Sequence, residues 1–215
     1  MWIRCWAIAG LLLSLLAADA VGVFTSVDNW LQARRYALAK APVDSNLVVL
    51  AVDSNSIARI GQWPWPRQIH AQIVDKLVAA RANQIAFDID FSSASPMPGD
   101  DAFRKSLEAA GGSTILAGFR QFDGEKLTDT VPLAAFSEHA WIASVSVKVD
   151  SDGVIRRVPF GEKLAGQQTP SLAAYLAQVN GKELADINVD FSISSSSFQI
   201  VPAIDLIEGR VPASL

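Results

Sequence analysis

The sequence contains very little cysteine and histidine. Among its 215 residues are one cysteine, Cys5, and two histidines, His70 and His139. A single cysteine cannot form an intramolecular disulfide, and the chain after it has neither a thiol nucleophile nor the thiolates of a zinc site. The two histidines lie too far apart along the chain for a two-histidine metal motif. These shortages exclude the common cysteine- and histidine-based sites.

An excess of basic residues is also lacking. The 18 Lys and Arg residues are outnumbered by 22 Asp and Glu residues, so the net charge is −4. Nucleic-acid phosphates are normally met by clustered Lys and Arg. The sequence also contains no phosphate loop of the Gly-x-x-x-x-Gly-Lys type and no nucleophile elbow. We therefore expect no nucleic-acid partner, no cofactor and no bound metal.

Apolar residues are abundant instead, and many of them lie near the N-terminus. Half of all residues are apolar, which excludes a disordered or collagen-like chain. Residues 5–18 read CWAIAGLLLSLLAA, between Arg4 and Asp19. If the apolar run continues to Phe24, it reaches the roughly 20 residues that a membrane-spanning helix needs, and Asp19 near its end is tolerable. We expect residues 1–25 to form a transmembrane helix.

Two other interpretations of this segment stay open. A cleaved signal peptide also has a basic start and an apolar core, and residues 18–20, Ala-Asp-Ala, fit its cleavage site. A buried core helix is the third interpretation. Trp2 and Trp6 at one end and Trp30 at the other favour a span. Because Arg4 holds the short N-terminal side in the cytoplasm, we expect a single span of the cell inner membrane, with the main domain periplasmic or extracellular.

The chain after this segment alternates between predicted helices and strands. A helical neck, residues 26–43, precedes a domain of residues 44–215. Apolar runs predict strands, and apolar stripes at helical spacing predict helices. The predicted order is strand 47–52, helix 67–80, strand 84–89, helix 102–110 and strand 114–119. This alternation indicates right-handed βαβ units and a mainly parallel sheet flanked by helices.

The second half of the domain has a different pattern. The strand-like runs 141–149 and 154–160 are separated by Asp-Ser-Asp-Gly at residues 150–153, which is a hairpin signal. Further predicted elements are a helix at 171–179 and strands at 187–193 and 198–201. The predicted fold class is α/β: a mainly parallel sheet flanked by helices, with an antiparallel hairpin extension, preceded by one N-terminal membrane helix.

Polar side chains follow the first two predicted strands. Asp53 and Ser54 follow the first strand, Asp88 and Asp90 follow the second, and Arg67 opens the helix between them. Ligands of parallel sheets bind outside the carboxyl ends of the strands, where loops and helix N-termini converge. These residues are candidates for binding a cation or a polar metabolite. The alternative is that each one caps a helix or fixes a loop.

The loop before the helix at 67–80 carries two tryptophans. Residues 61–67 read GQWPWPR, and the alternating prolines hold Trp63 and Trp65 on a stiff loop. Stiff exposed aromatic rings make good binding surfaces, although one or both rings could anchor the loop to the core instead. We predict that both tryptophans, Arg67 and the three aspartates cluster at one edge of the sheet.

One short motif suggests an enzyme. Residues 87–90, Phe-Asp-Ile-Asp, resemble the first motif of haloacid-dehalogenase-like phosphotransferases. In that family the first aspartate, here Asp88, is the nucleophile and the second, here Asp90, is the acid and base, beside a divalent cation. The residues that follow depart from the family pattern. A metal-dependent phosphohydrolase is therefore an alternative hypothesis.

Several blocks of the sequence together resemble a known family. Residues 48–53 read VVLAVD, residues 60–67 read IGQWPWPR and residues 85–91 read IAFDIDF. Weaker echoes occur in residues 152–159, DGVIRRVP, and 170–173, PSLA. Together with the preceding membrane segment, this order is similar to the CHASE type-two domain, the extracellular sensory domain associated with cyclases and histidine kinases in bacterial receptors.

The resemblance implies a sensory input module without catalysis. Its output, a nucleotide cyclase, diguanylate cyclase, phosphodiesterase or kinase, would lie outside this chain. Because such domains end with a further sheet strand, the resemblance implies that residues 44–215 are truncated at the C-terminus. We expect the chain to bind an unknown small ligand or periplasmic partner and to be attached to the membrane. We also expect it to associate with a second copy through the neck and membrane helix. A ligand-free dimerising scaffold is the structural alternative.

Overall fold

The computed structural model of the chain describes residues 6, 10, 12–14, 16–18, 22–44, 46–179 and 186–211. The chain divides into two compact units, one of residues 1–47 with 190–198 and one of residues 48–189 with 199–215. Most of the predicted membrane helix, residues 1–25, lies outside the described residues. Within those that are described, no helix combines the length and the hydrophobicity that a membrane crossing requires.

The first unit contains the neck helix α2 (Thr25–Leu38), which matches the helix that the sequence predicts there. A distant segment of the same unit contacts its C-terminal half. The Tyr36 and Phe191 rings meet edge to face with their centroids 6.0 Å apart. Just after the helix, the Ala41 backbone N–H donates to the Ser192 carbonyl at 3.3 Å. The neck helix is therefore held on its Tyr36 side.

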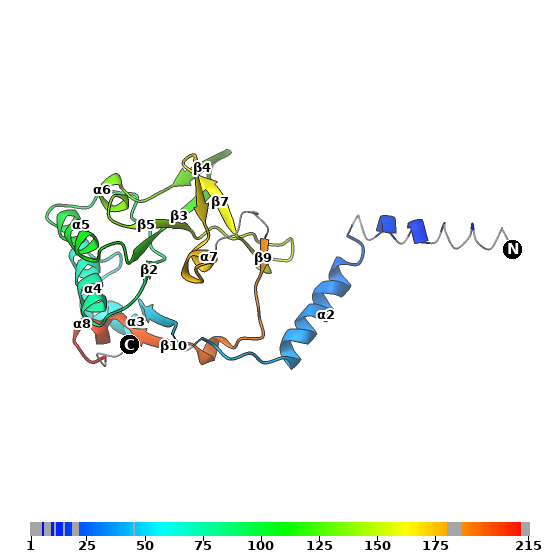
Figure 1. The fold of residues 1–215 in the computed structure, drawn as a ribbon, viewed down its shortest axis with the longest axis horizontal. Helices are drawn as coiled ribbons and strands as arrows, with labels where there is room; N and C mark the ends of the chain where they lie inside the picture. Colours follow the sequence, from blue (N-terminus) through cyan, green and yellow to red (C-terminus); the bar gives the residue numbers. More distant parts are fainter. Residues whose placement is uncertain are drawn as a thin grey trace. The chain divides into compact units, whose positions relative to one another are not determined.

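The second unit contains a three-stranded parallel sheet that a hairpin extends (Figure 1). β3 (Thr114–Asp123) lies between β2 (Ile85–Phe87) and β5 (Trp141–Ser144), and both neighbours run parallel to its first half. The second half of β3 pairs antiparallel with β4 (Lys126–Thr130). Because β2, β3 and β5 are parallel, their carboxyl ends lie at one edge of the sheet and their amino ends at the other.

Three further strand pairs belong to the second unit. They are β1 (Val48–Ala51) parallel with β10 (Gln199–Pro202), β6 (Arg157–Pro159) antiparallel with β9 (Asp186–Asn188), and β7 (Gly161–Leu164) antiparallel with β8 (Gln167–Pro170). β1 and β2 therefore belong to different sheets. This separates the strand that precedes Asp53 from the strand that precedes Asp88.

Two helices, α4 and α5, cover the core of the second unit and lie side by side in Figure 1. The helices of this unit are α3 (Ser54–Ile60), α4 (Arg67–Ala79), α5 (Gly99–Ala109), α6 (Ala134–Ser137), α7 (Leu172–Leu176) and α8 (Ala203–Ile207). The first unit has in addition the short 3-10 helix η1 (Ser195–Ser197). The core contains Val74 of α4, Phe103 and Leu107 of α5, and Leu116 of β3. Burial of these apolar side chains is the main force that holds helices and sheet together.

The α/β class is confirmed, whereas the division of the strands differs from the prediction. The described strands form separate sheets in place of one mainly parallel sheet. The two runs predicted for the hairpin at 141–160 meet in the Lys148–Arg157 bridge, but their strands have other partners, since β5 pairs with β3 and β6 pairs with β9. An apolar strand buries more surface beside β3 than in a two-stranded hairpin, which is only marginally stable by itself.

The turn of the predicted hairpin is nevertheless present. Gly153 has a φ of 82° and its N–H donates to the Asp150 carbonyl at 2.9 Å. Lys148 and Arg157 form an antiparallel bridge on either side of the turn. The sequence thus predicts the local turn correctly, while the tertiary contacts decide the strand partners.

Candidate functional site

The loop that enters α4 is fixed by Trp65. Its ring is buried, and its indole Nε1 donates to the Gly61 carbonyl at 2.9 Å, which closes the loop on itself. The Trp63–Pro64 peptide bond is cis. Pro66 is the N-cap of α4, and its ring fixes φ at −54° while ψ is still extended at 144°. Trp65 therefore anchors the loop to the core and offers little binding surface.

Trp63 is the accessible tryptophan of this loop. Its side chain is 36% exposed. Its ring meets the Trp65 ring edge to face at a centroid distance of 5.3 Å and the His70 ring at 5.9 Å. These contacts hold the ring in place. Trp63 is thus a positioned aromatic surface beside the start of α4.

His70 lies beneath the two tryptophans and is buried. Further aromatic rings surround it, namely Phe87, Phe91 and Phe103. Its Nδ1 has no hydrogen-bond partner among the described residues. Burial, with a smaller effect of the Arg67 charge, lowers the pKa of His70 to about 4. The imidazole is therefore neutral at pH 7 and packs as an aromatic core residue.

Arg67 is the first residue of α4, and its guanidinium lies against aromatic rings. Its Cζ is 4.4 Å from the centroid of Phe91, within the range of a cation–π interaction. Nη2 donates to the Ser93 carbonyl at 3.1 Å. Nε is 3.6 Å from Oδ1 of Asp100, which is too long for a hydrogen bond, and it has no hydrogen-bond partner among the described residues. Arg67 therefore retains a buried, unsatisfied donor.

The charge of Arg67 is balanced by aspartates from the following loop and helix. Burial lowers the pKa of Arg67, and attraction to Asp100 and then Asp90 opposes this effect. Arginine keeps its proton in proteins, so the guanidinium is charged. Ser95 holds Asp100 with two hydrogen bonds, from its backbone N–H at 2.8 Å and its hydroxyl at 2.7 Å. A Cβ at Gly99 would lie only 3.2 Å from the Cβ of Arg67, so glycine permits α5 to begin this close to α4.

The two aspartates after β2 have different surroundings. Asp88 is exposed and forms no hydrogen bond or ion pair with another described residue. Oδ1 of Asp90 accepts the Ser92 backbone N–H at 2.8 Å and so fixes the turn after the strand. Over the residues that the structure describes, no three His, Cys, Asp or Glu side chains form a group that could hold a metal ion. Asp90 thus has a local structural role, whereas Asp88 faces solvent.

Asp53 and Ser54 lie at the start of α3. Asp53 caps this helix, because its Oδ1 accepts the Ser56 backbone N–H at 2.8 Å. Hydrogen bonds from Ser56 lower the pKa of Asp53. The buried hydroxyl of Ser56 accepts the Ile204 backbone N–H at 3.1 Å and so connects α3 to the first turn of α8. Ser54 is exposed.

Of the predicted site residues, Trp63 and Trp65 contact the His70 ring, and Arg67 joins this group through Phe91, whose ring contacts both His70 and the guanidinium. The charge of Asp90 raises the pKa of Arg67. The contacts of Asp53 lie instead with α3 and α8. We call the joined group, together with its packing partners, the Arg67 cluster: Trp63, Trp65, Arg67, His70, Phe91 and Asp100. Sequence reasoning missed His70, although it lies one helical turn after Arg67 and beside Ile73 and Val74 on the buried stripe of α4.

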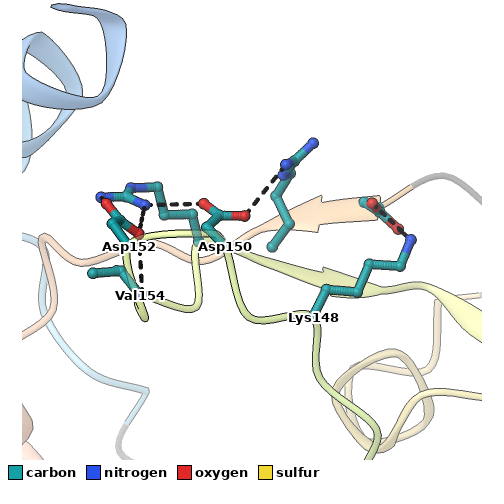
Figure 2. A network of polar contacts seen from close by, with 7 residues as sticks. Lys148, Asp150, Asp152 and Val154 are labelled. Atoms are coloured by element: carbon teal, nitrogen blue, oxygen red, sulfur yellow. Dashed lines mark hydrogen bonds and ion pairs between the residues drawn. The ribbon is translucent and has the colours of Figure 1, made fainter. Parts of the chain in front are cut away.

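A second polar network surrounds the turn at residues 150–154 (Figure 2). The guanidinium of Arg156 bridges Asp150 and Asp152 at distances of 2.7–2.9 Å. Hydrogen bonds, chiefly from Arg156, lower the pKa of Asp152 to about 2. Lys148 pairs with Asp186 of β9 at 2.9 Å, and this pair ties the turn to β9. The charged residues of the DGVIRRVP block therefore have a structural role, because they hold the turn together.

Comparison with known proteins identifies the family. No curated protein and no solved structure matches the chain. The family model described as the CHASE2 domain, the CHASE type-two domain, matches residues 5–214. This match covers nearly the whole chain and includes both units. The chain therefore belongs to the CHASE2 domain family, which is a family of extracellular sensory domains.

Proposed function

We propose that the chain is the extracytoplasmic sensory input domain of a bacterial membrane receptor. The match to the CHASE2 domain over residues 5–214 carries this proposal. The apolar run at residues 5–18 and the lone Arg4 before it support an anchor in the inner membrane, with the second unit on the periplasmic side. The output enzyme, a cyclase, phosphodiesterase or kinase, would be supplied outside this chain.

The location can be tested with a cysteine label. Phe122, at the tip of the β3–β4 hairpin, is 75% exposed, so a cysteine there would be accessible. In a Cys5→Ser background, Phe122→Cys should react with a membrane-impermeant maleimide added to cells whose inner membrane is intact. The Cys5→Ser chain without the new cysteine is the control. Labelling only after the inner membrane is lysed would refute the proposed location.

The Arg67 cluster is the proposed ligand site. Arg67 contributes a charged guanidinium whose side chain is 12% exposed, and Trp63, on the loop that leads into the same helix, contributes an exposed aromatic face. Both lie near the carboxyl end of β2, where parallel sheets bind ligands. A small polar ligand or a segment of a periplasmic partner that carries an acceptor group fits this chemistry. Asp53, Ser54, Asp88 and Asp90 stay as predicted contributors.

A ligand screen with matched variants tests this site. Compounds that raise the melting temperature of the full chain should lose this effect in Trp63→Ala, which removes the exposed face and leaves Trp65 in place. Trp30→Ala, on the neck helix, is the control. Ligands that stabilise both variants as well as the parent chain would exclude the Arg67 cluster as their site.

We propose further that the chain itself is not catalytic. Oδ1 of Asp90 accepts the Ser92 backbone N–H. Of the two aspartates of the Asp-x-Asp motif, only Asp88 therefore has a carboxylate without a hydrogen bond to another described residue. The purified chain should therefore leave p-nitrophenyl phosphate intact in the presence of magnesium. Hydrolysis that Asp88→Asn abolishes would favour the phosphohydrolase instead.

A further inference from the structure

An open groove lies between α5, α6 and β5, at the amino ends of β3 and β5. Its volume is about 410 Å³, within the range of small-molecule sites. The residues that matter for its chemistry are Glu108, Gly111, Gly112, Glu138, His139 and Trp141. The groove therefore lies at the opposite edge of the parallel sheet from the Arg67 cluster.

Trp141 forms a fixed aromatic wall of this groove. Its backbone pairs with Ile115 in the sheet, and its indole Nε1 donates to the Gly112 carbonyl at 3.0 Å. The Tyr175 ring supports it at a centroid distance of 6.1 Å. The side chain is nevertheless 57% exposed. Because the N–H is already satisfied, the exposed surface is the apolar, electron-rich face, and little side-chain entropy would be lost when a ligand binds.

The groove is negatively charged. Glu138 is exposed, and its carboxylate forms no ion pair or hydrogen bond with another described residue. Glu108 contributes a second carboxylate, which is paired with Arg104 at 3.1 Å. Among the described residues that line the groove, none is Lys or Arg. A bound cation would therefore lie near at least one carboxylate, that of Glu138, that is not paired with another described residue.

Two residues of the groove lining, Gly111 and Gly112, have no side chains. Gly111 and Gly112 have φ values of 62° and 85°, a conformation that favours glycine. A Cβ built on Gly111 would meet no atom within 4 Å, so it would project into open space. A Cβ on Gly112 would lie 3.7 Å from Nε1 of Trp141, so the absence of a side chain there leaves the space beside the indole open.

We propose that this groove binds a small organic cation of the quaternary ammonium class. The trimethylammonium group would lie on the Trp141 face, where cation–π attraction is strongest, and its charge would be near Glu138. Such a cation has no N–H donors, so it does not need the ring of hydrogen-bond acceptors that a primary amine requires. The inference does not rest on the sensory role, because binding is a property of the second unit alone.

Calorimetric titration of choline into the full chain tests the proposal. We expect saturable binding with a dissociation constant of the order of millimolar. Trp141→Leu and Glu138→Gln should each weaken it at least about fivefold. Trp30→Leu is a matched control, since Trp30 is also 57% exposed, and Glu125→Gln is a control for an exposed carboxylate. Equal losses in the controls would overturn the proposal.

Two further arms make the outcome specific. The uncharged isostere of choline, in which carbon replaces the nitrogen, should bind much more weakly, and equal binding would reduce the site to a hydrophobic contact and refute the proposal. Vesicles of phosphatidylcholine and of phosphatidylglycerol distinguish the source of the ligand. Binding to phosphatidylcholine vesicles that depends on Trp141 would assign the site to a lipid headgroup, whereas binding of free choline alone would assign it to a solute.

Discussion

His70 is a buried histidine that must stay neutral in the folded chain. Its pKa is about 4 when folded, against an ordinary value of 6.5, and Arg67 is the charged group that acts on it. Between these two values the unfolded chain binds a proton that the folded chain does not. Stability from this residue is therefore complete above pH 6.5 and is lost as the pH falls to 4.

We expect this loss to reach about 3 kcal/mol in the free energy of unfolding, from the size of the pKa difference. Urea unfolding between pH 7 and pH 4.5 measures it. His70→Leu should flatten the pH dependence in this range, whereas the half-buried His139 offers a control, His139→Leu, that should keep it. An equal slope in parent and His70→Leu would show that other groups dominate.

Arg67 owes its position to the planar shape of the guanidinium as well as to its charge. A lysine keeps the charge but cannot stack on Phe91 and donate to Ser93 at the same time. Arg67→Lys should therefore lower the free energy of unfolding by about 1–2 kcal/mol. Arg104→Lys, whose partners lie on the surface of α5, should have little effect. Equal effects of the two variants in urea unfolding would contradict the stacking argument.

At the scale of the element, the 150–154 turn depends on one arginine that holds two aspartates. The pKa of Asp152 is about 2, so its ion pair is present above the ordinary value of 3.8 and is lost as the pH falls through 2. Carboxyl NMR shifts should show Asp152 titrating near pH 2. Arg156→Gln should return its midpoint toward 3.8, and Arg104→Gln should leave it unchanged. A midpoint near 3.8 in the parent chain would show that the network is open in solution.

The elements that the sequence predicts best are those whose signals are local. The helix predicted at 67–80 is α4, because its apolar stripe and Pro66 mark it without reference to partners. The β7–β8 hairpin was missed, since its polar residues show no apolar run, and its turn at residues 165–166 is visible only in positive φ values of 46° and 82°. Strand partners were missed for a related reason, because pairing depends on burial against distant residues.

The candidate site shows the same limit. The Trp-Pro loop and Arg67 are visible in the sequence as an unusual block, and the structure brings them together. The contact between Arg67 and Asp100 is not visible in the sequence, because it depends on the approach of the first turns of α4 and α5. Gly99 permits that approach. Asp53 looks equivalent to Asp88 in the sequence, but β1 and β2 belong to different sheets.

At the scale of the whole molecule, the neck helix has an apolar stripe that stays exposed among the described residues of its own unit. Val27, Leu31 and Leu38 are exposed, and spacings of four and seven residues place them on one side of α2. Tyr36, which contacts Phe191, lies on another side of the helix. Exposed apolar stripes at this spacing are typical of helices that pair with a like helix. We therefore propose that two copies associate through the neck.

Sedimentation of the full chain over a range of concentrations tests this association. Leu31→Glu places a charge within the stripe and should raise the dimer dissociation constant at least about tenfold, which corresponds to about 1.4 kcal/mol. Ala33→Glu adds the same charge to an exposed position of the same helix outside the stripe, so it should leave the association unchanged. A chain that stays monomeric at all concentrations, or two variants with the same effect, would show that the stripe is not a dimer surface. A selective effect of Leu31→Glu would connect the neck helix directly to assembly, since both variants change the net charge equally.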